Sequence, residues 1–185
     1  QGKGAALSTV QIDVENCLQF EIRYTDESGE KVHPLILHAS ISGAIERNVY
    51  ALLEHQAALM RRGRKGSFPF WLAPTQIRFV PVSDAHRDFC DELAAGWPYR
   101  ADVDDREMSL GKKIKTAEQE WVPFIAVIGD REMAGGPLSV RVRGGEDFSG
   151  PREVLIRAMD VLQGARPRRP LNTPRNLARR PIFVG

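Results

Sequence analysis

The sequence IRFVPVSDAHRDFCDELAA, residues 77–95, places an apolar strand directly before an amphipathic helix. The pattern repeats downstream, where we expect strands over 100–104, 124–128 and 138–143 and helices over 110–120 and 152–162. Strands that alternate with helices favour an α/β layer, and a largely parallel sheet is expected because parallel neighbours need crossover connections. We therefore predict an α/β fold for this half of the chain.

The residues before this region follow another pattern. Alternating apolar and polar side chains predict antiparallel, hairpin-linked strands over 7–14, 18–24 and 32–38, and a helix is expected over 45–60. The charged segment 61–67, RRGRKGS, has no periodicity and is typical of an exposed connection. We place the domain boundary near Pro74, which gives domains over 1–73 and 74–185.

Composition narrows the class of protein. Hydrophobic residues make up 42% of the chain and charged residues 27%, which is typical of a globular protein. The longest apolar run is too short to cross a bilayer, so no membrane partner is expected. Cys17 and Cys90 lie far apart without a nearby second cysteine, which favours a reducing cytoplasm. The region 164–185 holds six arginines and no acidic residue, which indicates a polyanionic partner.

The segment LILHASISGAIERNVYALLE, residues 35–54, carries a second signal. An apolar strand ends near His38, a small-residue turn surrounds Gly43, and Arg47 lies in the first turn of a helix. An arginine fixed at that position can clamp a polyphosphate, and a glycine permits a close backbone approach. The alternative is a solvated surface pair between Glu46 and Arg47.

Several blocks together resemble a known family. The strand, turn and helix of 35–54 are similar to motif 3 of class II aminoacyl-tRNA synthetases. The blocks SFPFWLAPTQIRFVPVSD, VDDREMSLGKKI, WVPFIAVIGDREM and GGPLSVRVRGG resemble the anticodon-binding domain of the synthetases for glycine, histidine, proline and threonine. The threonyl enzymes are the most similar, and the tail PRRPLNTPRNLARRPIF resembles their archaeal branch.

The resemblance implies a fold and an activity. Residues 1–73 would be the remnant of a class II antiparallel-sheet catalytic core, and residues 74–185 an α/β anticodon-binding domain with a mixed, mostly parallel sheet. The implied activity is the ATP-dependent attachment of threonine to its tRNA by a homodimer. Motifs 1 and 2 have no counterpart upstream of motif 3, so the resemblance implies a C-terminal piece that is inactive by itself.

The resemblance also assigns roles to residues of the first domain. Arg47 would pair with the γ-phosphate of ATP, which is bound with Mg²⁺, and is the catalytic candidate. Thr9 and Gln11 would contact the adenosine and the threonine. His38 would be one of three protein ligands of a Zn²⁺ that coordinates the threonine hydroxyl in the complete enzyme. The alternative for His38 is a histidine of the protein core, and the alternative for Thr9 and Gln11 is a solvated strand face.

In the second domain, Glu132 and Arg141 match the family positions that read the third and middle anticodon bases. Strand alternation places Leu138, Val140 and Val142 on one face, so Arg141 and Arg143 lie together on the other. Two guanidinium groups on a sheet surface suit base edges and phosphates of an opened RNA loop. The alternative is a cross-strand Arg–Glu pair.

Three functions stay open on the sequence: a threonine-tRNA ligase, a non-catalytic tRNA-binding paralogue or truncated accessory protein, and a small-molecule α/β protein. The last is disfavoured because no Gly-x-Gly-x-x-Gly follows a strand. Motif 1, motif 2 and a Cys/His pair upstream of Gln1 would favour the ligase over the paralogue.

Overall fold

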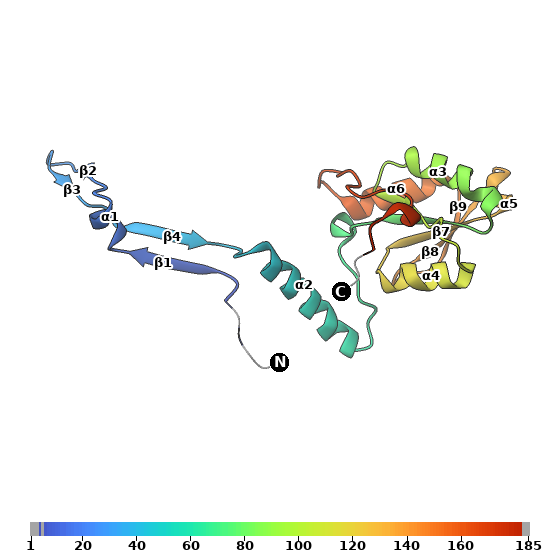
Figure 1. Cartoon of the computed structure of the whole chain (residues 1–185), viewed down its shortest axis with the longest axis horizontal. Coiled ribbons are helices and arrows are strands. Elements are labelled where there is room, and N and C mark those ends of the chain that lie inside the picture. Colours follow the sequence, from blue (N-terminus) through green and yellow to red (C-terminus); the bar gives the residue numbers. More distant parts are fainter. Residues whose placement is uncertain (1–3, 5, 183–185) are drawn as a thin grey trace. The chain divides into compact units, whose positions relative to one another are not determined.

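The computed structural model describes Gly4 and residues 6–182. The chain forms two compact units, residues 1–62 and 63–185, each described by itself (Figure 1). Among the described residues, no helix is long and apolar enough to span a membrane.

The first unit consists of two small antiparallel strand pairs and a long helix. Strand β1 (Thr9–Asp13) pairs with β4 (Ile36–Ser40), and β2 (Tyr24–Thr25) pairs with β3 (Lys31–Val32). Helix α2 (Ile45–Arg61) follows, as the sequence predicts. One face of the β1–β4 pair carries Val10, Ile12 and Leu37, which are each 65–69% exposed. A strand pair that belongs to a larger sheet leaves an apolar face of this kind.

The strand predicted over 18–24 is wrong. Helix α1 (Asn16–Gln19) occupies its start, and only Tyr24–Thr25 is a strand. The cause is Asp13, whose Oδ1 accepts hydrogen bonds from the backbone N–H groups of Glu15 (3.0 Å) and Asn16 (2.9 Å) and so favours a helical turn. The predicted strand over 32–38 is likewise divided into β3 and β4, with Pro34 between them lacking a backbone donor.

The second unit is built on a five-stranded sheet of order β6-β5-β7-β8-β9. Strand β5 pairs in parallel with β6 and β7, whereas β8 pairs antiparallel with β7 and β9. The sheet is therefore mixed, and its parallel part is smaller than the sequence suggests. The strands are β5 (Ile77–Pro81), β6 (Ala101–Val103), β7 (Phe124–Ile128), β8 (Leu138–Val142) and β9 (Phe148–Gly150).

Helices cover both faces of this sheet. Figure 1 shows α3 and α6 on one side and α4 on the other. The side under α3 and α6 holds the main apolar core, whereas a smaller cluster that includes Val80, Ala117 and Ile125 lies at α4. The helices are α3 (Arg87–Ala95), α4 (Leu110–Gln119), α5 (Asp130–Met133) and α6 (Arg152–Gln163), with short 3₁₀ helices η1 (Phe70–Leu72), η2 (Asp84–His86) and η3 (Leu177–Arg179).

The two compact units divide between residues 62 and 63, about ten residues before Pro74, near which we predicted the domain boundary. Phe70 is buried in the core of the second unit and contacts Tyr99 and Phe124 edge to face. Arg100 donates hydrogen bonds to the carbonyls of Trp71 and Ala73. The segment that precedes β5 is therefore part of the second unit's packing.

The arginine-rich tail is an ordered part of the second unit. The N–H of Val103 donates to the carbonyl of Arg175 (3.1 Å), and Val103 forms a parallel bridge with Asn176. The N–H of Ala178 donates to Asp105 (2.8 Å), and Leu177 is buried. The tail thus extends the sheet at the edge formed by β6, which neither its proline content nor its charge indicates.

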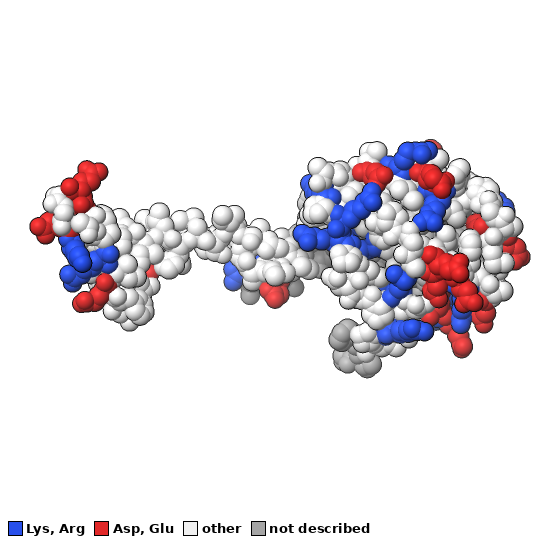
Figure 2. All heavy atoms as spheres, turned by 90° about the horizontal axis from the view of Figure 1, so that it is seen from above, with Lys and Arg blue, Asp and Glu red and all other residues white. Residues whose placement is uncertain are grey.

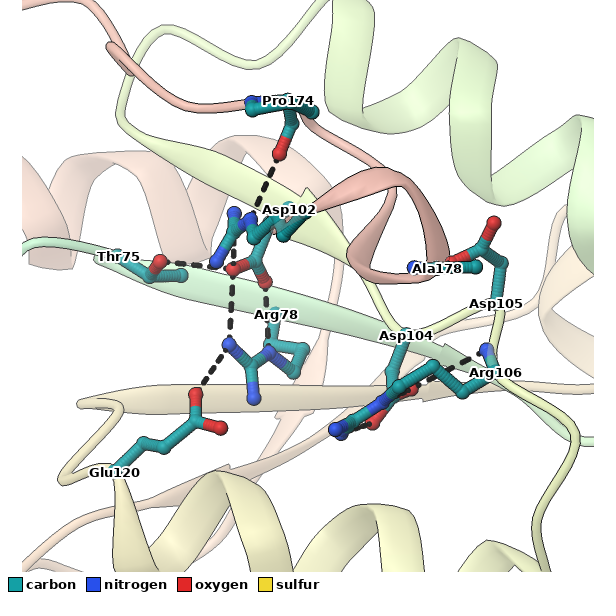
Figure 3. Close-up of polar contacts among 10 residues, drawn as sticks. Thr75, Arg78, Asp102, Asp104, Asp105, Arg106, Glu120, Pro174 and Ala178 are labelled. Carbon is teal, nitrogen blue, oxygen red and sulfur yellow. Dashed lines mark hydrogen bonds and ion pairs between the residues drawn. The ribbon is translucent and has the colours of Figure 1, made fainter. Parts of the chain in front are cut away.

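A fully buried ion pair joins β6, the strand at this edge, to its neighbour β5 (Figure 3). Arg78 and Asp102, on neighbouring parallel strands, are joined by two hydrogen bonds of 2.8 and 2.9 Å, and both residues are 0% exposed. Asp102 also accepts from Thr75 (2.8 Å) and from Arg180 of the tail (2.9 Å). Arg78 reaches Glu120 (2.7 Å) as well. Such a buried pair is tolerated because nearly every charged atom has a partner.

Candidate nucleic-acid interface

The polar face of β8 presents one available guanidinium group. Arg141 has a half-exposed side chain, and its recorded side-chain partner is Glu118 of α4 at 3.3 Å, an exposed pair of small energetic value. Arg143 lies on the same face, but it donates to the backbone carbonyls of Gly66 and Glu118. Arg141 and Arg143 both contact Glu118, but they differ in availability: backbone carbonyls hold the Arg143 guanidinium, whereas the side chain of Arg141 is half exposed.

Glu132 is held in place at the start of α5, just beyond the carboxyl end of β7. Its Oε2 accepts from the N–H of Gly129 (3.1 Å), and its Oε1 accepts from Arg131 (2.8 Å) and from the hydroxyl of Ser139 (3.2 Å). Burial by itself would raise the pKa of Glu132, but the hydrogen bonds from Arg131 and Gly129 hold the pKa below its ordinary value. Glu132 is therefore a fixed, ionised acceptor.

These contacts bring Glu132 and Arg141 to one face of the sheet. Ser139, which donates to Glu132, lies two residues before Arg141 on β8, so both side chains point to the same face. Glu132 is paired with Arg131, whereas Arg141 is paired with Glu118. Arg131 also donates to Ser139. The sequence did not single out Arg131, although it directly precedes Glu132.

The tail arginines have different roles. Figure 2 shows basic side chains grouped on part of the larger unit's surface. Arg166 stacks on Trp71 (4.7 Å to the ring centre), Arg168 stacks on Tyr99 (4.7 Å) and pairs with Asp160, and Arg180 pairs with Asp102. The side chains of Arg169 and Arg179 have no recorded partner within the described part of the chain, and both residues are exposed.

In the first unit, the β1–β4 pairing brings Gln11 and His38 together. They are direct register partners, and both line a hollow of about 770 Å³ with residues 12–16. The Nε2 of His38 lies 2.8 Å from Oδ2 of Asp13. Hydrogen bonds from the N–H of Asn16 and from His38 lower the pKa of Asp13 to about 2. Among residues 4 and 6–182, no group of three His, Cys, Asp or Glu side chains is placed to hold a metal.

Thr9 and Arg47 lie apart from this hollow. Thr9 is paired with Ser40, further along the same face of β1 as Gln11. Arg47 is exposed, and its Nη1 donates to the carbonyl of Ala6 (3.1 Å). Gly43 has a φ of +63°, and a Cβ at this position would lie 2.8 Å from the Leu7 carbonyl oxygen. A glycine is therefore required here, and the close approach is to the chain's own backbone.

Comparison with known proteins gives the second unit a class. Residues 76–159 match the family described as "Anticodon binding domain". The fold agrees: the RNA binding domain of threonyl-tRNA synthetase from Cryptosporidium parvum is similar over 84% of this chain and 38% of its own, with a TM-score of 0.59 and 24% identity. Prolyl-tRNA synthetase from the same organism is similar over 85% of this chain and 36% of its own (TM-score 0.61, 18% identity). Residues 76–159 are thus similar to anticodon-binding domains.

Sequence relatives extend this relationship to nearly the whole chain. "Threonine--tRNA ligase" of Pyrococcus horikoshii is 47% identical over 99% of the chain, and that of Pyrococcus furiosus is 48% identical over the same share. The corresponding protein of Methanococcoides burtonii is 44% identical over 98%. The chain is thus related to the threonine–tRNA ligases, and it spans 30% of the length of each of these relatives.

Proposed function

We propose that the chain serves threonine–tRNA ligation, the ATP-dependent attachment of threonine to its tRNA, and that its second unit reads the anticodon. One observation carries the proposal: an exposed arginine and a fixed, ionised glutamate lie on one sheet face of a domain that matches an anticodon-binding family. The first unit would be the end of the catalytic core, working in the cytoplasm within a homodimer.

Base reading follows from the chemistry of the two side chains. Arg141 can donate two hydrogen bonds to O6 and N7 of a guanine at the middle anticodon position. Ionised Glu132 accepts hydrogen bonds only, so it can receive an amino or imino group of the next base. Its existing partners fix the carboxylate before the RNA arrives, which reduces the ordering cost of binding.

The test is direct binding. The chain should bind threonine tRNA more tightly than the same tRNA with a changed middle anticodon base, by about tenfold or more, since a wrong base costs about 1–3 kcal/mol. Fluorescence anisotropy at fixed salt with end-labelled tRNA measures both affinities. Equal affinities for the two RNAs would refute anticodon reading by this chain.

In the first unit, we propose that Arg47 pairs with the γ-phosphate of ATP bound with Mg²⁺, and that Thr9 and Gln11 contact adenosine and threonine. Exposure of Arg47 and the polar face of β1 support this assignment. The chain by itself is not proposed to form the adenylate, because motif 2 of this synthetase class, which supplies the arginine for the α-phosphate, has no counterpart here.

His38 fits a zinc site as one ligand among several. Asp13 engages its Nε2, which leaves Nδ1 for a metal, and a carboxylate behind a ligating histidine is a common supporting contact. Zn²⁺ needs at least three protein ligands in a catalytic site, so the others would come from residues outside this chain. When bound, the zinc would hold the threonine hydroxyl and so select against valine.

In the complete ligase, His38→Ala should lower the zinc content and weaken the selection of threonine over valine. A lost ligand weakens metal binding, whereas Asp13→Asn should give a smaller loss of roughly 10–100-fold in metal affinity, as supporting contacts do. Metal analysis and amino-acid-dependent pyrophosphate exchange provide the two readouts. Unchanged zinc content with unchanged discrimination in His38→Ala would remove this residue from the site.

A further inference from the structure

A basic cavity lies in the second unit between η1 and the tail, away from the residues assigned to the anticodon. It has a volume of about 660 Å³, within the range of small-molecule sites. Its wall includes Arg100, Arg166, Arg169 and Arg180 and no acidic residue. Trp71 adds an aromatic side chain to the wall, and Arg166 stacks on its ring (4.7 Å to the ring centre).

Arg100 is a buried cation without a carboxylate partner in the described structure. The residue is 8% exposed and lies directly before β6, and its Nε and Nη2 donate to the carbonyls of Ala73 (3.0 and 2.8 Å) and Trp71 (2.8 Å). Burial lowers the pKa of Arg100 from its ordinary value, yet an arginine stays protonated near neutral pH. Nη1 has no recorded hydrogen bond and remains a donor for a ligand.

Two further arginines add charge that no side chain of the described chain neutralises. Arg166 has a recorded contact with the face of Trp71, and Arg169 has no recorded partner among the described residues. Arg180 differs because Asp102 neutralises it. Three uncompensated guanidinium groups around one cavity favour a multiply charged anion over a single carboxylate.

We propose that this cavity binds a nucleotide phosphate, with Arg100, Arg166 and Arg169 at the phosphate and Trp71 beside the base or sugar. The phosphate can come from a tRNA backbone or from a free nucleotide, and the first source rests on the proposed function. The cavity is separate from Arg141 in the fold. Arg100 and Thr75 precede the amino ends of β6 and β5, whereas Arg141 lies on β8, with β5 and β7 between it and β6.

The experiment follows the indole N–H signal of Trp71 in ¹⁵N-labelled chain by NMR, with Trp71→Phe to assign it. Inorganic phosphate, AMP, threonine tRNA and an anticodon-altered tRNA are titrated in separate arms. We expect a saturable shift of this signal. Saturation with both tRNAs identifies the RNA backbone as the source, and saturation with AMP but neither tRNA identifies a free nucleotide. Saturation with inorganic phosphate alone would overturn the proposed nucleotide.

Arg169→Gln is the informative variant, because its side chain has no recorded contact to lose within the described fold. It should weaken the binding that shifts Trp71 by about tenfold, as expected for a lost charged hydrogen bond. The matched control is Arg157→Gln, an exposed arginine of α6 that does not line the cavity. It should leave the shift and affinity unchanged.

The outcomes separate this proposal from the proposed function. If no ligand shifts Trp71 saturably, or if Arg169→Gln and Arg157→Gln weaken binding equally, the cavity is not a phosphate site. A Trp71 response that is equal for the cognate and the altered tRNA supports the cavity even where anticodon discrimination is absent. Discrimination without a Trp71 response in any arm overturns the cavity alone.

Discussion

Replacing Asp102 with asparagine should lower the free energy of unfolding of the second unit by about 3–5 kcal/mol, the usual cost of breaking a buried ion pair. Asp102 and Arg78 are both 0% exposed, and Asp102 accepts hydrogen bonds from Arg78, Thr75 and Arg180. Asparagine keeps the shape of the side chain but removes its charge. The guanidinium of Arg78 would then remain in the interior with Glu120 as its single acidic partner.

Urea denaturation followed by circular dichroism measures this change, and the melting temperature should fall by about 10 °C or more. The control is Asp88→Asn, an exposed aspartate in the first turn of α3, where a change within about 1 kcal/mol is expected. If Asp102→Asn costs no more than this control, the buried pair does not contribute net stability.

Arg141→Ala should reduce the affinity for threonine tRNA by about tenfold to a hundredfold while leaving the affinity for the anticodon-altered tRNA nearly unchanged. The reason is the loss of a bidentate contact to one base, worth about 1–3 kcal/mol. Its recorded partner in the free protein is Glu118, in an exposed pair at 3.3 Å, so its removal should hardly affect folding.

The affinities are measured by equilibrium titration with both tRNAs at several salt concentrations. Two further variants are measured in the same way. Arg141→Lys keeps the charge but lacks the planar fork, so it should lose most of the discrimination and retain the salt dependence. Arg157→Ala removes an exposed charge on α6 and should not alter discrimination. Equal weakening of both RNAs by Arg141→Ala would make it a phosphate contact, and the assignment of base reading to β8 would be wrong.

The sequence predicted those elements whose signal is local. Strands β5, β7 and β8 carry strand-length runs, and helices α2 and α6 carry helical spacing, so their existence was predicted. The strand prediction over 18–24 failed because the side chain of Asp13 accepts hydrogen bonds from the N–H groups of Glu15 and Asn16 and so favours a helical turn, which alternation cannot reveal. Strand β9 and helix α5 are only 3 and 4 residues long, too short for a periodic signal.

The same distinction holds for the candidate site. Arg141, in β8, and Arg143, one residue beyond its end, have the same parity, so alternation treats them alike. They differ because Arg143 bonds a carbonyl 77 residues away in sequence, a contact that no local pattern contains. The role proposed for Glu132 comes from the resemblance to a known family, whereas the Gly129 and Ser139 contacts that fix its carboxylate come from the folded structure.

The docking of the tail on β6 has a consequence for how the chain is made. Arg180 leaves the ribosome 78 residues after Asp102, whereas Arg78 is already present when Asp102 appears. Until the tail has been translated, the free edge of β6 has no neighbouring strand from the tail. The Oδ2 atom of Asp102 then also lacks the hydrogen bond from Arg180. An open strand edge is a template for pairing with another chain. Nascent chains that stall before residue 176 should therefore be the ones that need a chaperone.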